Sequence, residues 1–419
     1  MAKQEKVFSF EDLNKKMKEV SDFGSIMDEN EISTIDHYIH SGNYLLNAAL
    51  TGSLRRGYPG NRSVALAGPS GVGKTYLLLN GIRRAQQEEG YYTVFFDSEN
   101  AVDIDLMKKF GINTSMVRYE PVNTVQEFRH ISTVITEELL EAKKKGMQIP
   151  KILFVLDSAG NLATMKEVED AKSGSEKSDM TRSKILKSIF RILMTRLGIL
   201  KIPFWFSNHV YQTQDLFSKT IQGGGTGPEY AASIILFLTK SNLTEGQDKK
   251  GIIITAKPNK NRFAKPETVK FFLRYDRGMN PYVGLEKYFK WDICGIQRGK
   301  FISEKDFLKL KDEEKEECRQ HSWMETDAKG REKEIIQYFF PSDTARGYCV
   351  KHLNDTVKPE DLFTPKVITE EVIDKMDVYV RSDFEYAAGD ADDNFEELLN
   401  EGNEEVLDEK ELDEVLESN

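Results

Sequence analysis

Short apolar runs alternate with segments of helical periodicity along most of the chain. Continuous runs of β-branched and aromatic residues predict strands at residues 63–67, 92–97, 152–157, 203–207, 234–239, 251–256 and 268–275. Between them, apolar residues recur every three or four positions and predict helices at residues 74–89, 104–110, 124–145 and 181–200. Buried strands separated by helices favour an α/β fold with a mostly parallel sheet that helices cover on both faces.

The pattern changes on either side of this region. Residues 1–40 are polar, with Leu13, Met17 and Val20 at helical spacing, and are interpreted as a separate N-terminal arm. Residues 286–381 are less regular and are interpreted as a smaller α+β domain. We therefore predict an arm at 1–40, a core at 41–285, a C-terminal domain at 286–381 and a tail at 382–419.

Charge is distributed unevenly along the 419 residues. The net charge is −11, but residues 382–419 hold sixteen acidic side chains against Lys410, which leaves +4 on the rest of the chain. A mildly basic body permits a polyanionic partner without requiring one. The acidic tail is interpreted either as a solubilising disordered end or, because its apolar residues are spaced, as a short helix that docks on a partner.

Composition argues against a membrane or secreted protein. No apolar run approaches the ~20 residues that span a bilayer, and residues 1–10 lack the apolar segment of a secretory signal. Three cysteines in a chain of this size fit a reducing compartment, so we expect a cytoplasmic protein.

Residues 68–75 read Gly-Pro-Ser-Gly-Val-Gly-Lys-Thr and lie between a predicted strand and a predicted helix. The glycines leave successive backbone N–H groups free to surround a phosphate at the N-terminus of the helix. In this pattern the lysine reaches the β- and γ-phosphates, and the threonine hydroxyl ligates Mg²⁺. We therefore predict that a nucleoside triphosphate binds to Gly68, Pro69, Ser70, Gly71, Val72, Gly73, Lys74, Thr75 and the following Tyr76.

Two predicted strands end in carboxylates. The first of these residues, Asp157, is expected beside the phosphate loop, where it would hold the Mg²⁺ shell. The other strand ends in Asp97-Ser98-Glu99, and Glu99 is placed to orient a water for attack on the γ-phosphate. A helix N-cap cluster is an equally good interpretation of this second group, because Asp97 and Ser98 are good caps.

A long polar loop follows the predicted strand at 203–207. The strand runs into Asn208-His209, a position from which a polar side chain could sense the γ-phosphate. The loop itself, residues 210–228, is more typical of a functional segment than of a plain surface connection. Its candidate contacts with nucleic acid are Tyr211, Phe217 and Ile221 for the bases, and Lys219, Gly223, Gly224 and Gly225 for the phosphates.

Basic residues follow another predicted strand. Lys257, Lys260 and Arg262 could reach the γ-phosphate bound by a neighbouring subunit. Composition alone favours a solvated basic hairpin, and both interpretations stay open.

In this order and spacing, these elements resemble the RecA family of ATP-dependent recombinases, and most closely the UvsX recombinases of T-even-like bacteriophages. The resemblance covers roughly residues 20–290 and is most specific at residues 157–163, 178–182, 207–209, 217–220 and 223–228. It implies a RecA-like P-loop ATPase core with a mostly parallel twisted sheet, a small N-terminal oligomerisation arm and a small α+β C-terminal domain.

The resemblance also implies roles for single residues. Glu99 matches the glutamate that activates water, Asp157 the Walker B aspartate and His209 the γ-phosphate sensor. The aromatic residue that stacks on adenine in the family falls at Leu106, which can hold a base only by apolar packing. Residues 164–180 match the first DNA-binding loop and residues 210–228 the second, while Lys260 and Arg262 match the pair of cations that act across the filament interface. Candidate phosphate contacts at the first loop are Lys166, Lys172, Lys177 and Arg182.

The implied activity is hydrolysis of ATP with Mg²⁺, coupled to polymerisation on single-stranded DNA and to strand exchange with homologous double-stranded DNA. The implied partners are further copies of the chain, a recombination mediator and a single-strand-binding protein, in the cytoplasm of a bacterial host if a bacteriophage encodes the protein. A hexameric helicase with a RecA core and an ATP-gated, non-hydrolysing DNA-binding mediator remain alternatives.

One pattern lies outside the resemblance. Cys318 and His321, and then Cys349 and His352, form two Cys-x-x-His pairs whose spacing is possible for tetrahedral Zn²⁺. Zinc pairs are more often Cys-x-x-Cys, so ordinary packing of these residues is the alternative.

Overall fold

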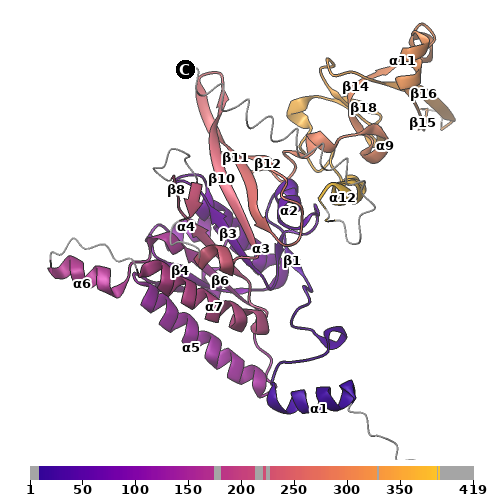
Figure 1. The fold of residues 1–419 in the computed structure, drawn as a ribbon. Helices are drawn as coiled ribbons and strands as arrows, with labels where there is room; N and C mark the ends of the chain where they lie inside the picture. The colour runs from indigo at the N-terminus through magenta and orange to yellow at the C-terminus, as the bar shows by residue number, and fades with distance from the viewer. Residues whose placement is uncertain are drawn as a thin grey trace, which may run out of the picture. The chain divides into compact units, whose positions relative to one another are not determined.

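A nine-stranded sheet lies at the centre of the computed structural model, which describes residues 9–173, 181–212, 220–222, 227–327, 330–384 and 386 (Figure 1). Neighbouring strands from β10 to β5 are parallel, whereas β11, β12 and β13 continue the sheet in antiparallel pairs. This arrangement confirms the predicted mostly parallel sheet. In spatial order the strands are β13 (Gly278–Met279), β12 (Val269–Arg274), β11 (Asp248–Asn261), β10 (Ile234–Glu245), β3 (Ser63–Ala67), β7 (Phe204–Asn208), β6 (Ile152–Asp157), β4 (Tyr92–Asp97) and β5 (Val117–Pro121).

Helices cover both faces of the sheet. Successive side chains of a strand point to opposite faces, and in β6 Val155 belongs to the core shared with α3 (Lys74–Glu89). Phe154, one residue earlier, belongs to the core shared with α5 (Val125–Lys144) and α7 (Arg182–Leu200), which lie side by side (Figure 1). Both strand residues are fully buried, which explains the continuous apolar run.

Two features of α3 fix its position on the sheet. A Cβ atom at Gly81 would lie 2.7 Å from the ring of Trp205, so the missing side chain lets the helix approach β7 closely. The helix stops at Gly90, whose φ of 70° is left-handed. Since α3 follows β3 through the phosphate loop, this packing also holds the loop at the carboxyl ends of the parallel strands.

Two strands are longer than the sequence pattern predicts. The pattern ends β11 at residue 256, but the strand continues to Asn261, because a bulge at Asn259 accommodates the neighbouring Pro258. Lys257 and Lys260 therefore lie within β11 rather than after it, which corrects the prediction. Its partner β10 continues to Glu245, past the end of β3, and stays paired with β11, which β12 flanks as far as Gly251. The edge strand β5 was not predicted, since most of its residues are exposed and it lacks a continuous apolar run.

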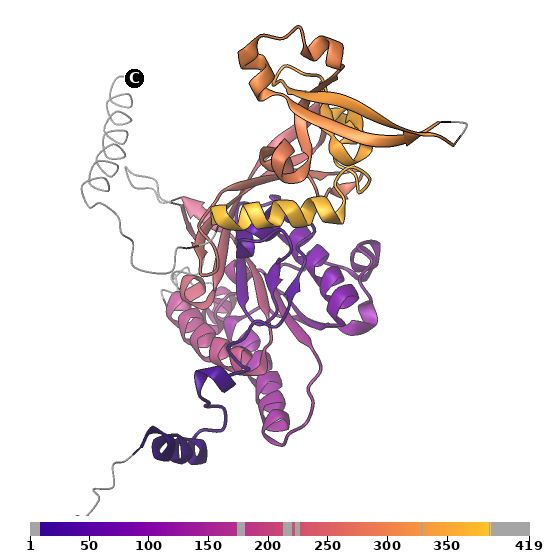
Figure 2. The same cartoon turned by 90° about the vertical axis from the view of Figure 1, so that its right-hand side faces the viewer.

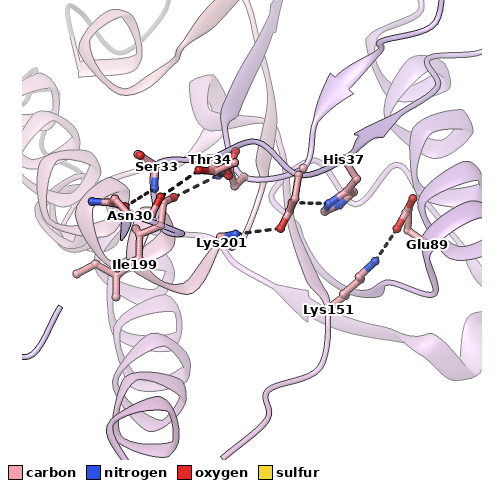
Figure 3. Close-up of polar contacts among 12 residues, drawn as sticks. Asn30, Ser33, Thr34, His37, Glu89, Lys151, Ile199 and Lys201 are labelled. Carbon is pink, nitrogen blue, oxygen red and sulfur yellow. Dashed lines mark hydrogen bonds and ion pairs between the residues drawn. The ribbon is translucent and has the colours of Figure 1, made fainter. Parts of the chain in front are cut away.

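The N-terminal arm begins with the predicted helix, α1 (Phe10–Val20). None of its residues, all of which the structure describes, is buried. The segment after α1 is tied to the edge of the sheet opposite the phosphate loop. There Arg62 donates to the carbonyl of Ser33 at 2.6 Å, and Lys201 pairs with Asp36 at 2.9 Å (Figure 3).

Lysines gather at this edge because α3, α5 and α7 all end there. The Nζ of Lys143 donates to the carbonyl of Ile199 at 2.6 Å, and Lys151 pairs with Glu89 at 2.5 Å (Figure 3). Cations complement the negative ends of helix dipoles and satisfy carbonyls that have no partner within the helix. These lysines are therefore explained by helix termination.

A second sheet follows the core in the sequence and confirms the predicted α+β character of that region. Its strands, in spatial order, are β15 (Arg319–Thr326), β16 (Glu332–Pro341), β14 (Ile296–Ile302), β17 (Tyr348–Val350) and β18 (Asp355–Val357). β15 and β16 form the long hairpin in Figure 2. Trp291 stacks on Phe339 with ring centroids 4.4 Å apart and forms a small core with Cys349. Three short helices accompany the sheet: α9 (Trp291–Cys294), α10 (Glu304–Phe307) and α11 (Asp312–Glu317).

The chain then returns to the core through α12 (Glu370–Phe384), the long yellow helix of Figure 2. This helix packs on α2 (Tyr44–Thr51). The buried carboxylate of Asp377 accepts hydrogen bonds from the Ser53 hydroxyl at 2.8 Å and the Leu54 N–H at 2.6 Å, and pairs with Arg381 at 2.6 Å. The helix is thus anchored by polar contacts as well as by apolar packing.

The remaining elements are short. They are α4 (Ile104–Lys109), α6 (Met165–Ser173), α8 (Gly227–Ala231), the pair β1 (Tyr38–Ile39) and β2 (Tyr58–Pro59), and the hairpin β8 (Val210–Gln212) and β9 (Thr220–Gln222). By their contacts, residues 1–385 group into one unit and residues 386–419 into another, so the four-part division stays a prediction. No helix in the described ranges is both long and apolar enough to cross a membrane.

Candidate active site

The loop of residues 68–73 connects β3 to α3, as the sequence predicts. Gly71 and Gly73 have φ values of 69° and 101°, which side chains with a Cβ atom rarely adopt. Among the described residues, no side chain caps the N-terminus of α3, so its first N–H groups remain available to an anion. Lys74, the first residue of α3, folds back over the loop and donates to the carbonyls of Gly68 and Pro69 at 2.9 and 3.0 Å. Burial lowers the pKa of its ammonium group.

Thr75 and Asp157 lie together, although they come from different elements. The Thr75 hydroxyl donates to Asp157 Oδ2 at 2.6 Å, and the hydroxyl of Ser207 bonds to the other carboxylate oxygen. Burial raises the pKa of Asp157, while these hydrogen bonds oppose the shift and the charge of Glu99 adds to it. Two hard oxygen donors at the end of the phosphate loop fit the coordination chemistry of Mg²⁺, whose charge would stabilise the buried carboxylate.

Glu99 follows β4 and faces this pair. Its Oε1 accepts a hydrogen bond from the Ser158 hydroxyl at 2.5 Å and lies 2.9 Å from Nε2 of His209. Burial raises the pKa of Glu99, but the hydrogen bonds from Ser158 and His209 and the charge of Lys74 outweigh burial, so the pKa lies below its ordinary value. The carboxylate is therefore ionised and held in one place beside the phosphate loop.

The N-cap interpretation of residues 97–99 does not hold. Helix α4 starts at Ile104, and the side chain that caps it is Asp103, which accepts from the Leu106 N–H at 2.7 Å. Asp97 instead accepts from the backbone N–H groups of Glu99 and Asn100, at 2.9 and 2.8 Å. Asp97 thus fixes the turn that presents Glu99.

A cavity of about 570 Å³ opens beside the first turns of α3. Its lining includes Leu106, the predicted base contact, and Tyr76, which was predicted to bind the nucleotide. It also includes Phe110 and Tyr275, which the sequence interpretation did not assign. Tyr76 packs edge to face on Phe110 with ring centroids 5.1 Å apart. Aromatic rings thus line the cavity despite the leucine at position 106.

Lys260 and Arg262 lie at the other end of the core. Lys260 pairs with Ile235 of β10, which in turn pairs with Ala65, the middle residue of β3. The pKa of Arg62, just before β3, is lowered by burial and further by the charge of Arg262. Because β11 is antiparallel to β10, Lys260 and then Arg262 lead away from the phosphate loop, which follows the carboxyl end of β3.

The candidate DNA contacts are only partly described. Lys166 and Lys172 are exposed on α6, while Arg182 begins α7 and bonds to the carbonyl of Gly160. Tyr211 and Ile221 pair across the β8–β9 hairpin. Lys177, Phe217, Lys219, Gly223, Gly224 and Gly225 lie outside the described residues.

The four candidate zinc ligands do not come together. Cys318 donates to the carbonyl of Glu314, His321 bonds to Asn354 at 2.7 Å, and His352 bonds to the carbonyl of Lys366 at 3.2 Å. Cys349 is buried in the small C-terminal core. Within the part of the chain that the structure describes, no three Cys, His, Asp or Glu side chains form a metal cluster. Packing therefore explains these residues better than zinc.

Sequence reasoning missed three residues around the phosphate loop. Ser158 and Ser207 directly adjoin predicted strand ends, a signal that could have suggested hydrogen bonds to Asp157 or Glu99. Lys240 donates to the carbonyls of Ser70 and Gly71 at 3.2 and 2.9 Å. No local motif marks this lysine, because only the register of β10 against β3 brings it to the loop.

Residues 10–280 match the family described as the RecA N-terminal domain. This chain belongs to that family. Over 259 residues it is 34% identical to the "Recombination and repair protein" of Enterobacteria phage T4, and the match covers 61% of this chain and 63% of the phage protein. The matched part is thus slightly less than two thirds of that relative.

More distant relatives carry the RecA name. Over 274 residues the chain is 25% identical to "Protein RecA" of Thermotoga neapolitana. This match covers 64% of this chain and 73% of that protein. Over 247 residues it is 26% identical to "DNA repair protein recA homolog 3, mitochondrial" of Arabidopsis thaliana. This match covers 57% of this chain and 54% of that protein. The RecA-family match ends at residue 280, so the second sheet lies outside it.

Proposed function

We propose that this RecA-family protein is an ATP-dependent DNA recombinase. It polymerises on single-stranded DNA as a helical filament and exchanges that strand with homologous duplex, in recombination, repair and recombination-dependent replication. The observation that carries this proposal is the 2.9 Å contact between Glu99 and His209. Glu99 lies beside the phosphate loop and His209 leads directly into the β8–β9 hairpin, so one contact joins the nucleotide site to the second candidate DNA loop.

ATP and Mg²⁺ fit the residues of the site. The N–H groups of the loop and of the first turn of α3 would hold the β- and γ-phosphates, and Lys74 would exchange its carbonyl partners for phosphate oxygens. Thr75 and Asp157 would hold the metal ion, which supplies charge neutralisation on the phosphates. The aromatic cavity beside α3 would take the base.

Glu99 is the proposed general base. Its ionised carboxylate can accept a proton from a water aligned with the γ-phosphate, and Ser158 holds it in that position. His209 would exchange its bond to Glu99 for one to the γ-phosphate. Loss of that phosphate on hydrolysis would reverse the exchange and change the hairpin that follows, which lowers affinity for DNA.

Lys260 and Arg262 are proposed to act on the nucleotide of the neighbouring subunit. Lys260 is level with the middle of β3, and Arg262 lies further toward the amino end, so both are directed away from the phosphate loop of their own chain. A filament in which ATP lies between subunits would bring this edge to the next nucleotide, where the cations stabilise charge in the transition state. The exposed apolar residues of α1 fit the predicted role of the arm in assembly.

DNA would be held mainly through its backbone. Lys166 and Lys172 are exposed on α6 and can meet phosphates, whereas Arg182 already bonds to Gly160 and would have to exchange that partner. Contacts with the backbone do not distinguish one base from another, so homology would be recognised by base pairing between the strands. A recombination mediator and a single-strand-binding protein are proposed further partners.

A hexameric helicase and a non-hydrolysing mediator are the competing functions. The test is ATP hydrolysis with and without single-stranded DNA, combined with electron microscopy of the same complexes. A recombinase is expected to hydrolyse ATP faster with DNA and to form helical filaments that exchange strands. Rings that unwind duplex would support the helicase, and ATP-dependent DNA binding without hydrolysis would support the mediator.

A further inference from the structure

We propose that Lys240 is a positioning residue for the phosphate loop and increases the affinity for ATP. This inference rests on the nucleotide binding proposed above. Its Nζ donates to the carbonyl oxygens of two consecutive loop residues, Ser70 at 3.2 Å and Gly71 at 2.9 Å. Both hydrogen bonds described for this ammonium group therefore go to the phosphate loop.

The sheet brings Lys240 to this place. β10 runs parallel to β3, and Phe237 is in register with Ala67, the last residue of β3. At about 3.3 Å per residue, Lys240 lies about 10 Å further along the strand direction. The chain of β3 has turned into the phosphate loop by then, while β10 continues straight because β11 supports it, with Lys240 paired to Ile254. The lysine therefore stands beside the outer side of the loop.

The contact orients N–H groups as well as carbonyls. In a trans peptide, the C=O and the N–H of the same unit point in opposite directions. The peptide units whose carbonyls face Lys240 carry the N–H groups of Gly71 and Val72, which therefore point away from the ammonium group. In a loop of this kind, N–H groups on that side line the phosphate site. Lys240 thus holds two of the loop's donors in the direction in which they bind an anion.

The charge of Lys240 acts in the same sense. Its ammonium group polarises the two peptide units, which strengthens their N–H groups as donors. Lys74 faces the same loop through its hydrogen bonds to the carbonyls of Gly68 and Pro69. Two cations of the same chain therefore face the loop from different sides, and an incoming triphosphate relieves their mutual repulsion.

The experiment compares Lys240→Met and Lys240→Arg with the wild-type chain. Binding of a fluorescent ATP analogue with Mg²⁺ is titrated, and steady-state hydrolysis gives KM and kcat. Removing a charged donor should weaken nucleotide binding and raise KM about tenfold, while kcat changes by less than about twofold. Lys240→Arg keeps the charge and several donors, so it should recover most of the lost affinity.

Lys270→Met is the matched control. This lysine is exposed on β12 of the same sheet. Its neighbour Phe271 shares the face of Lys240 through Ile254, so Lys270 points to the opposite face, and its loss removes one charge without removing a described loop contact. Thermal unfolding of each variant shows whether the fold is retained, as expected for an exposed side chain. Should Lys240→Met unfold, the comparison rests on Lys240→Arg and on Lys240→Gln.

Wild-type affinity in folded Lys240→Met would overturn the inference, and so would a loss confined to kcat. An equal loss in Lys270→Met would reduce the effect to general charge. Failure of the wild-type chain to bind the analogue would contradict the proposed function instead, which keeps the two failures distinct.

Discussion

On the proposed mechanism, Lys74 acts in nucleotide binding and Glu99 acts in hydrolysis. Lys74 faces the loop carbonyls and would meet phosphate in the ground state. Glu99 is ionised, is held by Ser158 and His209, and is the proposed base for the attacking water. The two residues therefore affect different steps, and single substitutions can separate them.

We predict that Lys74→Ala abolishes nucleotide binding, whereas Glu99→Ala keeps ATP-dependent DNA binding but loses turnover. The lysine contributes in the ground state, while the carboxylate acts on the water, and removing a general base typically costs about 10²–10⁴-fold in rate. Nucleotide titration, DNA binding with ATP and steady-state hydrolysis measure the three properties. Near-normal hydrolysis by Glu99→Ala would remove Glu99 from the catalytic role.

The second residue-scale prediction concerns pH. Burial raises the pKa of Glu99, yet the hydrogen bonds from Ser158 and His209 bring it below the ordinary value, so the base stays ionised at lower pH than a free glutamate. Ser158→Ala removes one of these donors and raises that pKa. The acidic limb of the profile of kcat/KM against pH should therefore move to higher pH, by up to about one unit.

Ser158→Thr is the control for this prediction, because it retains the hydroxyl group. It should restore the acidic limb toward that of the wild-type chain. An unchanged limb in Ser158→Ala would show that the hydroxyl does not tune the carboxylate.

At the scale of elements, the β10–β11 ribbon contacts the core at two functionally different levels. Lys240 of β10 reaches the phosphate loop, while Lys260 of β11 is level with the middle of β3 and Arg262 follows it, leading away from the loop. The paired strands β10 and β11 thus connect the chain's own candidate nucleotide site with the cations proposed to serve the next one. The bulge at Asn259 increases local twist and directs the last residues of β11.

The anchoring of α12 gives a prediction on stability. Asp377→Ala leaves the Ser53 hydroxyl, the Leu54 N–H and the Arg381 guanidinium without their shared acceptor in a buried place. We expect a loss of about 2–3 kcal/mol in the free energy of unfolding, since buried donors left unpaired cost more than exposed ones. Chemical denaturation followed by circular dichroism measures the change.

Asp374→Ala is the matched control on the same helix. Asp374 pairs with Arg55, but its side chain is 67% exposed, and exposed ion pairs contribute about 0–1 kcal/mol. Equal effects of the two substitutions would show that α12 is not anchored through Asp377.

At the scale of the whole molecule, the cations proposed to act on one ATP molecule fall into two separate groups. The described contacts place Lys74 and Lys240 at the phosphate loop, and Lys260 and Arg262 at the opposite edge of the core. On the proposed interface, two chains bring both sets to one nucleotide. Assembly and hydrolysis are therefore expected to depend on each other.

Mixing experiments test this dependence. Arg262→Ala should bind ATP almost normally as a monomer but hydrolyse it poorly with DNA, because the arginine serves the neighbouring subunit. An equimolar mixture with Lys74→Ala should recover part of the activity, at interfaces that join an intact nucleotide site to an intact arginine. If co-assembled mixtures never exceed the two separate proteins, the action across subunits is refuted.

Local sequence patterns by themselves determined much of the fold and the position of the candidate site. The strands at Ser63–Ala67, Tyr92–Asp97 and Ile152–Asp157 and the helix at Lys74–Glu89 agree with their predicted bounds. Their apolar runs and the glycine loop are signals contained within a few residues. For the same reason the positions of Thr75, Glu99 and Asp157 near the carboxyl ends of the strands could be predicted from where β3, β4 and β6 end.

Tertiary structure alone decided which distant side chains meet. Lys240 reaches the phosphate loop only because β10 is parallel to β3 in one register, and Lys260 lies at the opposite edge only because β11 is antiparallel and bulged. The Cys-x-x-His pairs have suitable spacing in the sequence, yet each residue finds a different partner in space. Sequence spacing limits what neighbouring residues can do within one element, whereas strand order, direction and register fix the distances between elements, and these arise from packing of the whole core.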